Sequence, residues 1–115
     1  MAGAKLVIVY PQPLDVSQFE EAYLTDHLPM AQKGLIGATK AVLTKILGSA
    51  DGTIPPFHRI VEIHFPSLEA LHACAMTQGA KDTLAHAISI SSGGPPAFLI
   101  AEQEEVISLE ERAAA

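Results

Sequence analysis

The hydrophobic pattern between residues 16 and 30 is the strongest structural signal in the chain. At helical spacing, one narrow stripe carries apolar or aromatic residues and a single histidine, namely Val16, Phe19, Tyr23, His27 and Met30. Pro29 lacks a backbone donor and leaves the carbonyl of Thr25 free, so we expect the helix to bend or stop there. His27 would then lie on the buried face near the last helical turn, where the helix dipole favours a positive charge.

Four other segments have the patterns of strands. Residues 5–10 and 97–102 are apolar at nearly every position, which indicates strands buried on both faces. Residues 39–47 alternate and predict a less buried strand. Residues 57–65 predict a strand with two different faces, one with Phe57, Arg59, Val61, Ile63 and Phe65, the other with His58, Ile60, Glu62 and His64. We assign the first, more apolar face to the helices, with Arg59 at the strand end reaching solvent.

Helical spacing returns at residues 67–76 and 80–90. The element order is therefore βαββαβ, which predicts an α+β fold of the ferredoxin-like type, a sandwich of a four-stranded antiparallel sheet with its helices on one face. We expect one domain over residues 1–103, followed by a tail at 104–115 that is acidic and then alanine-rich.

The two most apolar segments predict a partner as well as a fold. Residues 5–10 and 97–102 are apolar on both faces, yet helices would cover only one face of the sheet. An uncovered second face would expose a larger apolar patch than monomers usually carry. We therefore expect a homodimer in which two copies pack sheet to sheet.

Composition narrows the partners and the compartment. Seven basic and thirteen acidic residues give 7 − 13 = −6, which disfavours nucleic-acid binding. No apolar run approaches the ~20 residues of a membrane helix and no signal-peptide pattern begins the chain, so we expect a cytoplasmic protein without a membrane contact. The single cysteine, Cys74, cannot form an internal disulfide, and we place it in the core.

His27 is the leading candidate for chemistry, although a structural role at the helix break is equally open. As a general acid/base it would line a pocket between helix and sheet and keep a ring nitrogen free of protein partners. As a structural residue it would have both nitrogens hydrogen-bonded. Tyr23 lies one helical turn earlier and is either its orienting group or a core aromatic. Glu62 is either its partner carboxylate or part of a salt link in the dimer interface.

The remaining histidines give no metal motif. His27, His58, Glu62 and His64 are suitable ligand types, but HxH and HExxH spacings are absent from the sequence and one strand separates His58 from His64 by ~20 Å. We therefore predict no metal site and no bound cofactor. His72 and His86 are expected on helix surfaces.

Four stretches resemble the EthD family, namely KLVIVYPQP, FEEAYLTDHLPMAQK, FHRIVEIHFPSLEAL and FLIAEQE, which together span residues 5–102. The most specific pattern is F-x-x-x-Y-x-x-x-H-x-P, with a turn glycine and a third-strand acid further on; the matching residues are Phe19, Tyr23, His27, Pro29, Gly37 and Glu62. This resemblance implies a dimeric α/β barrel built from two ferredoxin-like subunits. Relatives in that superfamily include cofactor-free monooxygenases, isomerases and cyclases.

The resemblance also implies a function. We expect an EthD-like protein that acts in, or is accessory to, oxidative catabolism or tailoring of a small hydrophobic molecule, bound between the first helix and the sheet. His27, Tyr23 and Glu62 would carry the chemistry, and Tyr10, Ile60, His64 and Phe98 would contact the bound molecule. The alternative is a non-catalytic dimer that binds or carries such a molecule.

Overall fold

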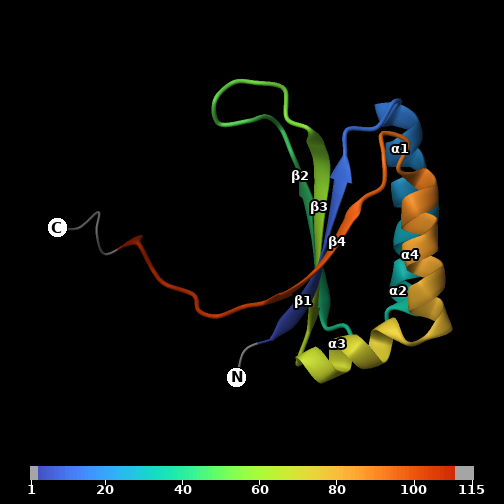
Figure 1. The fold of residues 1–115 in the computed structure, drawn as a ribbon, viewed down its shortest axis with the longest axis vertical. Coiled ribbons are helices and arrows are strands. Elements are labelled where there is room, and N and C mark those ends of the chain that lie inside the picture. The colour runs from blue at the N-terminus through green and yellow to red at the C-terminus, as the bar shows by residue number, and fades with distance from the viewer. Residues whose placement is uncertain (1–2, 111–115) are drawn as a thin grey trace.

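The computed structural model describes residues 3–110 as a single antiparallel sheet with helices on one face (Figure 1). Its elements in chain order are β1 (Ala4–Pro11), α1 (Val16–Ala22), the π-helix η1 (Tyr23–His27), α2 (Leu28–Gly34), β2 (Lys40–Lys45), β3 (Phe57–Phe65), α3 (Leu68–Ala75), α4 (Gln78–Ile90) and β4 (Ala97–Glu102). This is the α+β, ferredoxin-like architecture that the sequence predicts.

The sheet has the strand order β2-β3-β1-β4, so the two most apolar strands, β1 and β4, are neighbours. Ile8 of β1 lies opposite Val61 of β3 and Phe98 of β4, and these three side chains face the helices. In Figure 1 the helices α1, α2 and α4 run along that face, while α3 lies at the end of the sheet where β1 begins. The face with Val61, Ile63 and Phe65 is buried, as expected.

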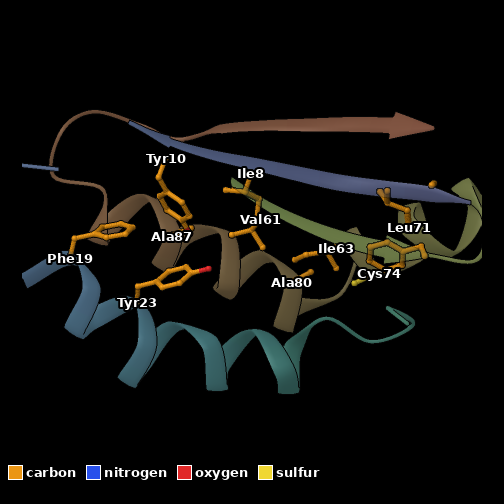
Figure 2. Close-up of a cluster of buried hydrophobic side chains, with 12 residues drawn as sticks. Ile8, Tyr10, Phe19, Tyr23, Val61, Ile63, Leu71, Cys74, Ala80 and Ala87 are labelled. Atoms are coloured by element: carbon orange, nitrogen blue, oxygen red, sulfur yellow. The ribbon is translucent and has the colours of Figure 1, made fainter. Parts of the chain in front are cut away.

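Three aromatic rings form the centre of the core at one end of this interface. Phe19 and Tyr23 stack with their ring centroids 5.6 Å apart, and the ring of Tyr10 meets them edge-on at 5.1 and 5.9 Å. Figure 2 shows Tyr10 projecting from the sheet toward Phe19 and Tyr23 on the helix below. Edge-on and offset contacts of this kind stabilise aromatic pairs beyond the area that they bury.

The helix that carries His27 runs from residue 16 to residue 34 without stopping at Pro29. Asp15 caps its start by accepting a hydrogen bond from the backbone N–H of Gln18. In the middle, the N–H of Leu28 donates to the carbonyl of Tyr23, five residues earlier, which makes η1 a π-helical turn. Pro29 then falls in the first turn of α2, where a missing N–H costs least. The helix therefore continues through Pro29 after a widened turn, where the sequence led us to expect a bend or a stop.

A β-bulge changes the start of β3. Tyr10 pairs with Arg59 but Pro11 pairs with Phe57, so the register shifts and His58 has no partner on β1. Both His58 and Arg59 are consequently buried, with 5% and 9% of their surface exposed. The predictions that His58 lies on the second face of β3 and that Arg59 reaches solvent are wrong, because strict alternation does not continue through the bulge.

The opposite face of the sheet is open in the described chain. Glu62 and His64 are half-buried there, and Lys5 donates to the Glu62 carboxylate at 2.7 Å across the β1–β3 pair. Beyond β4, residues 103–110 run outward on the side away from the helices (Figure 1). The predicted tail therefore continues past the sheet, and its residues 111–115 lie outside the described part. Within residues 3–110, we find no helix whose length and apolarity would suffice to cross a membrane.

Candidate functional site

A hollow of about 490 Å³ lies between the helical layer and the β1, β2 and β3 side of the sheet. Its walls are largely aliphatic, with Ile8, Val61, Ile63, Leu28, Leu35 and Leu84 among the lining residues. The buried polar groups that line it are Tyr10, Tyr23, His27 and Thr83. Gln32, Thr39 and Lys40 also line it and are exposed, so they mark its opening to solvent. Such a space suits an apolar molecule with a few polar atoms.

His27 is buried, with 4% of its surface exposed, and both of its ring nitrogens contact protein side chains. Nε2 lies 3.4 Å from the Tyr10 hydroxyl oxygen, and Nδ1 lies 3.0 Å from Nδ1 of His86. The two imidazole rings are nearly parallel, at 14°, with centroids 5.2 Å apart, so they meet edge to edge through these nitrogens. His27 therefore lines the hollow, as expected of an acid/base, but both nitrogens have protein partners, as expected of a structural histidine, and the expectation of a free ring nitrogen is wrong. The Tyr10 contact is nevertheless long for a hydrogen bond, so Nε2 is the more weakly held nitrogen.

Burial, and to a lesser extent the nearby imidazole of His86, lower the pKa of His27 to about 4. The ring is therefore neutral at neutral pH. A neutral imidazole has one bare nitrogen and one N–H, so it can accept a proton and donate another. The positive charge that a helix end would favour is not supported here, because the helix continues past His27 to Gly34 and the ring is buried.

The two tyrosines hold their protons on either side of His27. Burial raises the pKa of Tyr10, and the neighbouring phenol of Tyr23 adds to the rise. Burial also raises the pKa of Tyr23, against the opposing effect of the Arg59 guanidinium, whose central carbon lies 4.7 Å from the Tyr23 ring centroid. The Tyr23 hydroxyl is buried and has no hydrogen-bond partner in residues 3–110. Figure 2 shows this oxygen pointing into the interior. Leaving a buried hydroxyl unpaired costs about 1–3 kcal/mol, which a bound polar atom could recover.

The structure gathers some of the sequence-predicted residues and separates others. Tyr10, Tyr23 and His27 line one hollow. Phe98 is on the helix side too, but it lines a second, smaller hollow of about 180 Å³. Ile60, Glu62 and His64 lie on the open face of the sheet, paired across strands with Val9, Val7 and Lys5.

The expected partnership of Glu62 with His27 is wrong for the subunit, because the sheet separates the two residues. Glu62 alternates with Val61 and Ile63, whose side chains line the hollow from the other side. The hydrogen bond from Lys5 lowers the pKa of Glu62, so this carboxylate forms a salt link on the open face.

His86 is the site residue that the sequence reasoning missed. It was expected on the helix surface, yet it is half-buried and contacts His27. The buried stripe of α4 contains Ala80, Thr83 and Ala87. His86 directly precedes Ala87 and lies at the edge of that stripe, which is the signal that could have found it. His72 is exposed, as predicted.

A second polar cluster joins α1 to the bulge of β3. Arg59 donates to both oxygens of Glu20, through Nε at 2.8 Å and through a terminal nitrogen at 2.7 Å, and His58 Nε2 donates to the same carboxylate at 3.1 Å. The guanidinium contact is the main reason why the pKa of Glu20 falls to about 2. The bidentate geometry fixes α1 against the sheet.

Residues 3–110 contain no group of three or more His, Cys, Asp or Glu side chains arranged to hold a metal ion. Cys74 is buried in the core, where burial raises the pKa of its thiol. The thiol is therefore not poised as a nucleophile.

Comparison with known proteins agrees with this architecture. No family model matches the chain. It is 30% identical over 104 residues to an uncharacterised 11.0 kDa protein of the thcB-thcC intergenic region of Rhodococcus erythropolis, covering 90% of this chain and 97% of the relative. The crystal structure of an ethyl tert-butyl ether D (EthD) family protein from Bacillus halodurans superposes with a TM-score of 0.81 at 27% identity, covering 89% of this chain and 99% of the other. An EthD-like protein from Ralstonia eutropha shares the fold, with a TM-score of 0.66 at 22% identity, over 88% and 91% of the two chains.

Proposed function

The protein belongs to the EthD family, and on this basis we propose that it takes part in the catabolism or tailoring of a small, largely apolar organic molecule. The molecule would bind in the hollow beside His27, with its polar end toward His27 and Tyr23. The observation that carries the proposal is the unpaired, buried hydroxyl of Tyr23 in the same hollow as a neutral imidazole. An oxygen atom on the bound molecule would satisfy the hydroxyl.

The chemistry of the hollow favours an uncharged substrate that contains a hydroxyl or carbonyl oxygen. The deep polar groups are neutral phenols, a neutral imidazole and the hydroxyl of Thr83, so a fully charged group would lose its hydration without gaining a counter-charge. Tyr23 would donate to the oxygen, and His27 would take a proton from an adjacent O–H or C–H group. The reaction class is therefore proton transfer next to an oxygen, as in enolisation.

Binding can be tested with 2-naphthol and naphthalene, which differ by one hydroxyl. The chain contains no tryptophan, so naphthol fluorescence can be followed without that background. We expect 2-naphthol to bind more tightly than naphthalene, and Tyr23→Phe to reduce this preference roughly fivefold, the value of about one hydrogen bond. His72→Gln, on an exposed helix surface, is the matched control and should change nothing. Equal affinity for the two compounds would contradict the assigned polar end.

Catalysis can be separated from simple binding by isotope exchange. In D₂O, the protein should speed the exchange of the α-protons of 2-tetralone, an apolar ketone, and His27→Gln should abolish the acceleration. Proton NMR measures the loss of the α-proton signal directly. Binding of 2-naphthol without any acceleration of exchange would favour the second candidate, a protein that binds or carries a hydrophobic molecule.

A homodimer through the open sheet faces is the quaternary structure that we propose. Val42 and Leu99 on that face are 39% and 51% exposed. The segment beyond β4 carries Val106, Ile107 and Leu109, which are 82%, 66% and 60% exposed, and it projects on the same side (Figure 1). A second copy would cover both surfaces.

We expect a dimer interface of roughly 1,600 Å², typical of specific complexes. Sedimentation should give a dimer at micromolar concentration. Leu99→Glu should yield a monomer, whereas Leu47→Glu, in the exposed loop after β2, should leave the dimer intact. A wild-type monomer at micromolar concentration would contradict the proposal.

A further inference from the structure

Two imidazoles meet nitrogen to nitrogen beside the hollow, and a contact of this kind has only one proton to share. The Nδ1 atoms of His27 and His86 are 3.0 Å apart, and the rings are nearly parallel, at 14°. When both rings are neutral, one Nδ1 must carry a hydrogen and donate it to the other. No carboxylate lies within ion-pair distance of either ring in residues 3–110, and the titratable groups that face His27 from other elements are Tyr10 on β1 and His86 on α4, with Tyr23 one turn away on its own helix.

The direction of the shared proton follows from Tyr10. The Tyr10 side chain is fully buried, and its hydroxyl proton has His27 Nε2 as its protein partner. If Nε2 carried a hydrogen, it would donate to the Tyr10 oxygen, and the hydroxyl proton of Tyr10 would then need another acceptor, which is costly for a buried group. Tyr10 therefore donates to a bare Nε2, and His27 carries its hydrogen on Nδ1. That hydrogen points at His86 Nδ1, which must be bare, so His86 carries its own hydrogen on Nε2.

We propose that His86 is the positioning residue of His27: it accepts the Nδ1 hydrogen, holds His27 with Nε2 bare toward the hollow, and passes protons between His27 and solvent. This inference rests on the proposed function of His27 as an acid/base. The half-buried position of His86 suits the role, because the ring reaches from the buried imidazole toward the surface of α4.

The proton count closes over one cycle. A proton from the bound molecule goes to His27 Nε2, displacing the long Tyr10 contact. The Nδ1 hydrogen of His27 then moves to Nδ1 of His86, and the Nε2 hydrogen of His86 leaves to water. The pair now has the reverse polarity, with His27 protonated at Nε2 and ready to act as an acid. Return of a proton from water to His86 Nε2 sends the same steps backward, delivers a proton to the bound molecule and restores the starting tautomers.

The test is the tautomer of His27 in the ligand-free protein, read by long-range ¹H–¹⁵N NMR on ¹⁵N-histidine-labelled protein. The five histidines can be assigned by single substitutions. At pH 7 we expect His27 with its hydrogen on Nδ1 and His86 with its hydrogen on Nε2. His27 with its hydrogen on Nε2 would overturn the proposal.

Two variants separate hydrogen bonding from packing. His86→Asn places an amide oxygen near the position of Nδ1 and removes the ring, so the Nδ1–H tautomer of His27 should survive. His86→Phe keeps an aromatic ring at this position and removes the acceptor, so His27 should lose its preference for the Nδ1–H form. If His86 had only a packing role, the Nδ1–H tautomer of His27 would instead be kept in His86→Phe and lost in His86→Asn. The backbone amide spectrum of each variant reports whether the fold is intact.

The relay itself is tested by the exchange of 2-tetralone. His86→Asn keeps His27 in place but cannot pass a proton on, so we expect exchange to slow at least tenfold and added imidazole to restore part of the rate. Unchanged exchange in this variant would overturn the relay. Failure of 2-naphthol or 2-tetralone to bind would count against the proposed function. It would not affect the tautomer assignment of the His27–His86 pair, because that measurement is made on the ligand-free protein.

Discussion

The two buried histidines of this protein, His27 and His58, have opposite surroundings. His58 donates to Glu20, which also holds Arg59, so that cluster combines a carboxylate with a guanidinium. Within residues 3–110, the polar contacts of His27 are with a phenol and another imidazole, both uncharged groups. The cluster of His58 joins α1 to β3, whereas His27 lines a hollow of about 490 Å³.

The difference teaches which kind of buried histidine is available for chemistry. In the ionised cluster of Glu20, His58 and Arg59, each charged group already has a partner, so a ligand would gain few new hydrogen bonds there. The neutral cluster of Tyr10, His27 and His86 lies beside the unpaired hydroxyl of Tyr23, and the pKa of His27 is lowered to about 4. Perturbed groups at a cavity mark functional sites more often than perturbed groups in closed ion pairs.

The largest change in stability is expected from a substitution that breaks the cluster of Glu20, His58 and Arg59. Glu20→Gln removes the counter-charge of Arg59, whose side chain is 11% exposed, and should lower the free energy of unfolding by about 3 kcal/mol at pH 7. Urea unfolding measures the change. Glu21→Gln, on the exposed neighbour, is the control and should lie within about 0.5 kcal/mol of wild type. An equally small effect of Glu20→Gln would make the cluster irrelevant to stability.

The contributions of His27 and Glu20 to stability should be lost in different pH ranges. The pKa of His27 is lowered from 6.5 to about 4. Between these pH values the unfolded chain binds a proton at His27 and the folded protein does not, so the free energy of unfolding falls as the pH drops from 6.5 to about 4. The pKa of Glu20 is lowered from 4.5 to about 2, so its contribution is lost in a lower window.

We expect a loss on the order of 2 kcal/mol between pH 6.5 and 4, measured by urea titrations at fixed pH. His27→Gln should flatten the upper window alone, and Glu20→Gln the lower window alone. A wild-type stability that is constant from pH 7 to pH 4 would show that His27 titrates normally.

A clash introduced between helices α2 and α4 should disturb the contact of His27 with His86 and leave the cluster of Glu20, His58 and Arg59 unchanged. Gly34 of α2 touches Gly79 of α4, and a Cβ on Gly34 would lie 2.7 Å from the Gly79 carbonyl oxygen. Gly34→Ala should push the helices apart, cost about 1–2 kcal/mol and weaken the His27–His86 contact. NMR of the histidine side chains would show shifts at His27 and His86 but not at His58. Gly48→Ala, with open space around it, serves as the control.

The smallest effect has the opposite sign. Tyr23→Phe removes a buried hydroxyl that lacks a partner, so the ligand-free protein should gain up to about 1 kcal/mol. Thermal unfolding would show a higher melting temperature. A loss of stability would mean that the hydroxyl is already hydrogen-bonded in the folded protein, which would remove the main support for a ligand oxygen at this place.

The elements were predictable from the sequence because each has a clear period. Residues 57–65 and 97–102 form strands with the predicted limits. Phe19, Tyr23 and His27 of the predicted stripe are buried, whereas Val16, its first member, is 46% exposed. The partners of His27 were not predictable to the same degree. Tyr10 could be placed because it ends an inner strand, whereas His86 lies at the edge of a helical stripe, where exposure depends on how closely two helices pack.

The errors on β3 have two causes. Alternation correctly predicts Glu62 on the open face, so its expected contact with His27 fails because the sheet lies between the two residues. The bulge at His58 and Arg59 depends on the pairing with β1, which periodicity within one strand does not reveal.

The π-helical turn from Tyr23 to His27 has a consequence for ancestry and for engineering. A turn of this kind accommodates one residue more than an α-helical turn, so removing a single residue between 24 and 26 would restore ordinary α-helix without breaking the chain. Because the widened turn itself absorbs the extra residue, the residues on both sides of the deletion would keep roughly their present facing, and His27 would stay on the side of Tyr23 and the hollow. A homologue shorter by one residue here would show a gap in an alignment and would still present its imidazole to the cavity.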